Sequence, residues 1–132
     1  MATVRKEVQL HARAENVWDA LRDWGAAHKR LVPGFVVDLR IDGEDRIVTF
    51  FNGLTVRERF VDLDEDERRL VWSTVGGSLS HHNASAQVFD DGDGITRVVW
   101  IADLLPHQAA ATVAEMMERG TAVLKQTLEA AA

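Results

Sequence analysis

The sequence predicts an α+β fold, in which a curved seven-stranded antiparallel sheet wraps around a long C-terminal helix and two short helices follow the first strand. Three observations support it. Seven segments alternate apolar and polar residues, with the two-residue period of a half-buried strand. Short turn sequences join the last six in series, which favours antiparallel pairing. The final segment, Pro106 to Ala131, has helical spacing instead.

The chain begins with one strand and two short helices. Val4 to Leu10 alternates as a half-buried strand does. Ala14 to Trp24 changes to helical spacing and ends before Gly25. Ala26 to Leu31 is expected to form a second short helix, because Pro33-Gly34 breaks any continuation.

Six further strands are expected after the helices. They span Val36 to Asp42, Arg46 to Phe51, Leu54 to Leu63, Arg69 to Val75, His81 to Phe89 and Ile95 to Leu104. Asn52-Gly53 is a strong hairpin signal between the second and third of these. Strands that follow one another through such turns build an antiparallel sheet.

One long helix must cover this wide sheet. About 26 residues at 1.5 Å each would make it roughly 39 Å long, and only Gly120 interrupts its good helix formers. A curved sheet around a single helix leaves a gap that side chains do not fill completely, so a pocket is expected there. The inner stripe of the helix would contain Val113, Met116 or Met117, Gly120, Leu124 and Leu128.

Composition sets further limits. The 132 residues are 46% hydrophobic and 27% charged, which suits a single globular domain over residues 1–132. A net charge of −6 without a basic stripe argues against nucleic acid and anionic membranes as partners. No apolar run approaches the roughly 20 residues of a membrane span, and the first residues lack a signal peptide's apolar stretch, so a cytoplasmic protein is expected. The expected partner is a small apolar molecule, and the sequence is also compatible with a homodimer.

Three local motifs resemble those of a known family. They are VWDALRD at Val17 to Asp23, VRERF at Val56 to Phe60, and TRVVW at Thr96 to Trp100, which runs on to Leu105-Pro106. Their order resembles the START-like (SRPBCC) superfamily, of the polyketide cyclase/dehydrase type, over nearly the whole chain. The resemblance implies a helix-grip fold that encloses a small apolar molecule. Some members cyclise or dehydrate polyketides, but the chain has no tyrosine, which counts against the phenol-assisted aromatase mechanism of other members.

Glu58 is the first candidate catalytic residue. On a strand it shares one face with Val56 and Phe60, while Arg57 and Arg59 share the other. If the arginines are solvated, Glu58 points into the pocket, where burial would raise the pKa of its carboxyl and make it an acid or base near neutrality. Alternatively, a bulge shifts the alternation and Glu58 pairs with a cation on an exposed face.

His82 is the second candidate catalytic residue. Adjacent residues on a strand face opposite sides, so His81 and His82 cannot bind one metal ion together without distortion. His82 shares its face with Ala84 and Ala86, whose small side chains would leave room for a ligand, whereas the face of His81 is polar. A hydrogen-bonded structural histidine is the alternative to a catalytic one.

The pocket wall is expected to be mostly apolar. Trp72 and Trp100 share strand faces with apolar residues, so they either line a pocket for a planar ligand or fill the core. The predicted ligand-binding residues are Trp72, Trp100, Val56, Phe60, Ala84, Val113, Met117 and Gly120.

Two classes of function follow. The first is a cofactor-free polyketide cyclase or dehydratase; the second is a non-catalytic carrier or sensor of a hydrophobic ligand. The chain has no cysteine and no His, Asp or Glu cluster with metal-ligand spacing, so neither a metal nor another cofactor is expected. Two polar groups aimed at one place in the cavity would favour the enzyme, and one or none would favour the carrier.

Overall fold

The computed structural model describes residues 1–132 and confirms the predicted fold class. The strands are β1 (Ala2–His11), β2 (Val36–Asp42), β3 (Asp45–Phe50), β4 (Thr55–Asp64), β5 (Arg69–Val75), β6 (His81–Gly92) and β7 (Ile95–Leu105). The helices are α1 (Ala14–Leu21), the π-helix η1 (Ala27–Leu31), the 3₁₀-helix η2 (His107–Ala109) and α2 (Ala110–Ala130).

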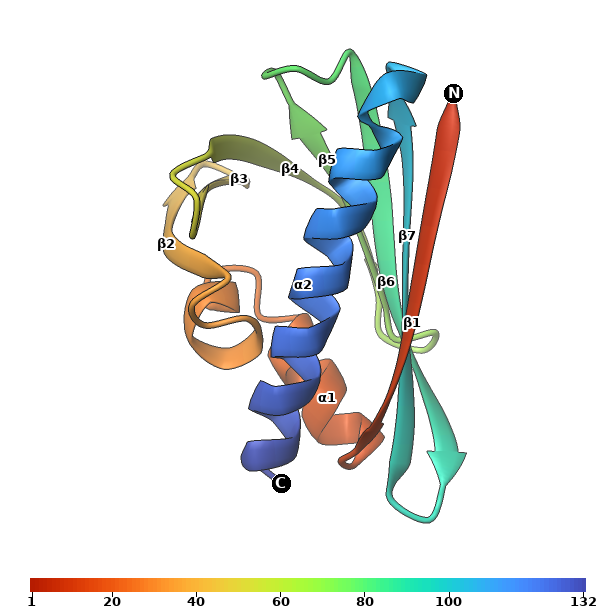
Figure 1. Cartoon of the computed structure of the whole chain (residues 1–132). Coiled ribbons are helices and arrows are strands. Elements are labelled where there is room, and N and C mark those ends of the chain that lie inside the picture. Colours follow the sequence, from red (N-terminus) through yellow and green to blue (C-terminus); the bar gives the residue numbers. More distant parts are fainter.

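The seven strands form one antiparallel sheet in the order β1-β7-β6-β5-β4-β3-β2. The first and last strands therefore lie side by side, and α1 and η1 carry the chain across to the other edge. The sheet curves around α2, which packs mainly on β1 and η1 (Figure 1). The inner face of α2 buries Met117, Gly120, Thr121, Leu124 and Leu128. Four of these belong to the predicted stripe; Thr121 was not predicted, and Val113 is half-buried.

The helices differ from the prediction in three respects, and several strand ends differ by one to three residues. α1 ends at Leu21 instead of Trp24, because Trp24 is held outside the helix, where its Nε1 donates to the Glu44 carbonyl oxygen at 3.2 Å. The second short helix has π rather than α geometry. Pro106 has an extended backbone (φ −75°, ψ 157°) and precedes the helical residues instead of starting α2.

The β-bulge considered for the fourth strand is present. The β4–β5 register shifts between Phe60 and Asp62, and Val61 is 51% exposed. The bulge falls after Glu58, so the alternation that turns Glu58 inward is intact. No helix is both long and apolar enough to cross a membrane.

Candidate functional site

A cavity of about 290 Å³ lies between α2 and the concave face of the sheet. Of its 28 lining residues, 21 are hydrophobic, so the wall suits a mainly apolar molecule. The other seven are Arg46, Glu58, Thr74, Ser78, His82, Thr112 and Thr121. Arg46, Glu58 and His82 are the only ionisable groups among them.

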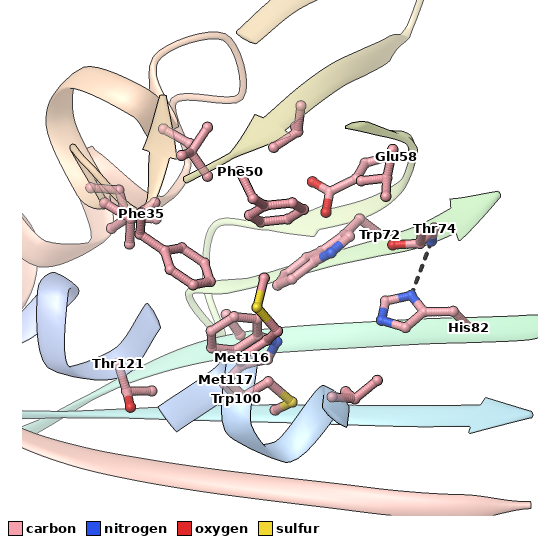
Figure 2. A pocket seen from close by; sticks show the side chains of 18 of the residues that line it. Phe35, Phe50, Glu58, Trp72, Thr74, His82, Trp100, Met116, Met117 and Thr121 are labelled. Carbon is pink, nitrogen blue, oxygen red and sulfur yellow. Dashed lines mark hydrogen bonds between the residues drawn. The ribbon is translucent and has the colours of Figure 1, made fainter. Parts of the chain in front are cut away.

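Four of the polar residues lie on successive strands and form what we call the polar row: Arg46, Glu58, Thr74 and His82. Arg46 on β3 is the register partner of Glu58 on β4, and Glu58 is the partner of Thr74 on β5. The Thr74 amide in turn donates to the His82 side chain on β6. The sheet thus places these residues on neighbouring strands of the cavity wall. Figure 2 shows Glu58, Thr74 and His82 on this wall.

Arg46 and Glu58 form a buried ion pair. Arg46 Nε donates to Glu58 Oε1 at 2.8 Å, and the two side chains are only 9% and 10% exposed. A second guanidinium nitrogen of Arg46 donates to the Trp24 carbonyl oxygen at 3.1 Å, and the guanidinium lies 3.8 Å from the centroid of the Trp24 ring. Glu58 therefore faces the cavity with its charge balanced by a fixed cation.

His82 is held by the backbone of the neighbouring strand. The β5–β6 pairing ends at Trp72 and Ala84, and the amide of Thr74 donates instead to His82 Nδ1 at 3.0 Å. Because Nδ1 accepts this bond, the proton of the neutral ring is on Nε2. Burial lowers the pKa of His82 below its ordinary 6.5; the charge of Glu58 opposes the shift and that of His81 adds to it. His81 itself is exposed.

Five of the eight predicted ligand-binding residues line the cavity. They are Trp72, Trp100, Val56, Val113 and Met117. The rings of Trp72 and Trp100 are tilted against each other, with centroids 6.1 Å apart, so they form one apolar wall. The two predicted catalytic residues, Glu58 and His82, line the same cavity.

The other three predicted ligand-binding residues do not line it. Phe60 packs edge-on against Trp24, with ring centroids 5.4 Å apart. Ala84 is 1% exposed in the core, paired with Trp72 and with Ala102. The space at Gly120 is filled, because a Cβ there would lie 2.8 Å from Cζ3 of Trp100.

Arg46 is the main residue that the sequence analysis missed. It shares a strand face with Val48 and Phe50, both of which line the cavity. This alternation could have placed Arg46 on the inward face of the strand. It was not used in that way, because a charged residue near a turn is usually exposed. Phe35, Met116 and Thr121 also line the cavity without having been predicted as ligand-binding residues. The His, Asp and Glu side chains form no group of three that could hold a metal ion.

The chain belongs to the polyketide cyclase / dehydrase and lipid transport family, whose model matches residues 1–129. No curated protein matches the sequence.

Solved structures show the same fold. A protein from Thermobifida fusca is 28% identical, with a TM-score of 0.76 over 98% of this chain and 91% of that one. A START superfamily protein from Mycobacterium smegmatis is 14% identical, with a TM-score of 0.82 over 98% and 99%. BexL, a di-domain ARO/CYC protein of the BE-7585A biosynthetic pathway, is also 14% identical, with a TM-score of 0.78 over 98% of this chain and 47% of that one.

Proposed function

We propose that this protein binds a small, mainly apolar molecule in the cavity, with a polar group of that molecule at the polar row. The observation that carries the proposal is the composition of the wall, which is apolar except for a few hydroxyl groups and the polar row. The volume of about 290 Å³ lies just below the ~300–1,000 Å³ range of ligand pockets. This favours a compact molecule over a long lipid chain.

Native mass spectrometry of protein purified from its own host tests the proposal, because a retained ligand adds its mass to the chain. An apolar fluorescent dye gives a second test. Val113→Trp should fill the cavity and abolish dye binding, since Val113 lines it. Ala111→Trp is the matched control, because Ala111 is exposed on the same helix. Equal dye affinity of both variants and wild type would contradict the proposal.

A second candidate function is that of a cofactor-free cyclase or dehydratase, and the shared wall of Glu58 and His82 favours it. The carboxylate can remove a proton from the carbon next to a ligand carbonyl while His82 Nε2–H donates a hydrogen bond to the carbonyl oxygen. The resulting enolate can attack a second carbonyl and close a ring, with the Glu58 carboxyl returning its proton to the new alkoxide. Alternatively, the enolate can expel a β-hydroxyl group, which takes the proton from the Glu58 carboxyl and leaves as water. The family and the ARO/CYC similarity support this candidate.

Enolisation can be tested without knowing the natural substrate. A bound methyl ketone in D₂O should exchange its α-protons faster with wild-type protein than with Glu58→Gln, because the amide keeps the shape of the carboxylate but cannot accept the proton. The methyl signal in proton NMR follows the exchange. If the protein is only a carrier, both proteins exchange the ketone at the same rate and differ in affinity alone.

A further inference from the structure

We infer that His82 determines ligand specificity by selecting neutral molecules with a hydrogen-bond acceptor, such as a ketone, aldehyde or ester oxygen, over hydrocarbons and carboxylates. The inference deepens the proposed function and rests on it. It names the chemical class of the polar group that the ligand brings to the polar row.

The hydrogen bond from Thr74 fixes which face of the imidazole can be offered to a ligand. Nδ1 is occupied by the Thr74 amide at 3.0 Å. That amide cannot turn away, because Thr74 is held in the β4–β5 ladder opposite Glu58. Nε2 is on the side of the ring away from Thr74 and points toward the cavity (Figure 2). His82 therefore presents one N–H donor to the cavity and needs an acceptor opposite it.

The charges of the polar row favour a neutral acceptor. Arg46 is already paired with Glu58 at 2.8 Å, so its positive charge is balanced. Burial keeps His82 neutral near pH 7 by lowering its pKa. A carboxylate that entered the cavity would meet no uncompensated cation and would lie near the Glu58 carboxylate, which is unfavourable in an apolar surrounding. A carbonyl oxygen accepts the Nε2–H bond without adding a charge.

Three probes that differ only at one group test this selection: 2-acetylnaphthalene, 2-ethylnaphthalene and 2-naphthoate. Each is titrated into ¹⁵N-labelled protein at pH 7.5, and chemical-shift changes give the Kd. The ketone should bind about three- to tenfold more tightly than the hydrocarbon, the size of one neutral hydrogen bond. The carboxylate should bind more weakly than both.

Two variants separate the role of the Nε2–H donor of His82 from that of its Nδ1 acceptor. In His82→Asn, the side-chain oxygen can take the place of Nδ1 and accept from Thr74, but no donor reaches the cavity. The preference for the ketone should then disappear. In His82→Gln, the amide nitrogen reaches the place of Nε2, so part of the preference should return. His81→Asn is the control, because His81 is exposed and outside the cavity.

The results separate the inference from the proposed function. Equal affinities of wild type for the ketone and the hydrocarbon, or a full ketone preference in His82→Asn, would overturn the inference and leave the binding function standing. Failure of all three probes to bind would overturn both. Long-range ¹⁵N–¹H NMR of the wild-type imidazole is an independent check that requires no variant. A proton on Nε2 at pH 7.5 supports the inference, and a proton on Nδ1 overturns it.

Discussion

Arg46 and Glu58 bring opposite charges into the wall of an apolar cavity, and each is tolerated there because the other is present. Their side chains are about one-tenth exposed and joined at 2.8 Å. Removing one member of such a pair leaves an isolated buried charge, whereas replacing both with apolar residues is often neutral or stabilising. The pair is therefore better explained by a role at the cavity than by a contribution to stability.

Substitution of Arg46 tests this view. Arg46→Met should lower the free energy of unfolding by about 3 kcal/mol, because Glu58 is left without its partner. The double variant Arg46→Met/Glu58→Leu should recover most of the loss. Urea unfolding measures both, with Arg40→Met as the control at an exposed position of β2. A double variant as unstable as the single one would show that the cost lies in lost packing against Trp24.

His82 should make stability depend on pH in a known direction. Its pKa in the folded protein is below the ordinary 6.5, so the unfolded chain binds the proton more readily. The contribution of neutral His82 to the free energy of unfolding is therefore fully present above pH 6.5. It is lost as the pH falls through the lower pKa that His82 has in the folded protein. Urea unfolding at pH 7.5 and 5.5 should show a larger loss for wild type than for His82→Asn. Equal losses would contradict the shift.

At the scale of single elements, α2 approaches the sheet most closely where it has no side chain. Gly120 sits against the ring of Trp100, and a Cβ would also come within 3.1 Å of Phe35. The glycine thus sets how near the helix lies to β7 and fixes one limit of the cavity. A larger residue there displaces Trp100 before it reaches the cavity.

Gly120→Ala should therefore reverse the usual effect of this substitution. In a free helix, alanine gains about 1 kcal/mol over glycine, but overpacking a core costs about 1–3 kcal/mol. We expect the free energy of unfolding, measured by thermal unfolding, to fall by about 1 kcal/mol. Dye binding should also weaken, because Trp100 moves into the cavity. Ala122→Gly at an exposed position should show the ordinary preference for alanine. A stabilised Gly120→Ala would contradict the close approach.

The β3–β4 hairpin shows how far sequence alone could lead. A two-residue turn at Asn52-Gly53 would oppose Phe51 to Leu54 and place Ile47 opposite Glu58. Instead, the Phe50 amide donates to the Leu54 carbonyl oxygen at 2.8 Å, and Arg46 faces Glu58. The alternation of each strand predicted the inward face of Glu58. The residue opposite Glu58 depends on the β3–β4 register, and a shift of one residue changes it. The Asn52-Gly53 signal did not fix the register that closely.

The same limit applies to the rest of the site. The order of strands and helices and the inward faces of Trp72, Trp100 and His82 follow from periodicity. Periodicity could not show that Phe60 and Gly120 lie outside the cavity lining. Their positions depend on which aromatic ring occupies the space beside each residue. Periodicity determines the direction of a side chain, whereas packing between distant elements determines whether it meets a cavity or a neighbour.

At the scale of the whole molecule, the cavity follows from how one helix is placed on a wide sheet. β1 joins β7, and α2 packs chiefly on β1 and η1. The sheet bends away from α2 toward β4, β3 and β2 (Figure 1). The strands β3 to β6 carry the polar row on the wall of the space that remains. Because α2 packs on only one side of the sheet, the same arrangement that forms the fold also leaves the space for the site.

Metal removal should leave this molecule unchanged. The chain has no cysteine, and its His, Asp and Glu side chains form no group of three suited to a metal ion. We expect the same melting temperature with and without EDTA, because a structural metal contributes directly to folding. A melting temperature that falls by several degrees in EDTA and recovers with zinc would refute this prediction.

The amide proton of Thr74 is donated to a side chain of β6, whereas residues 69–72 of β5 pair with the backbone of β6. Its exchange with solvent deuterium, measured relative to the intrinsic rate, therefore reports on His82 alone. When His82 takes up a second proton, Nδ1 can no longer accept, and the protection of this amide should fall while that of Trp72 persists. One backbone proton thus records the protonation state of His82, without knowledge of the ligand.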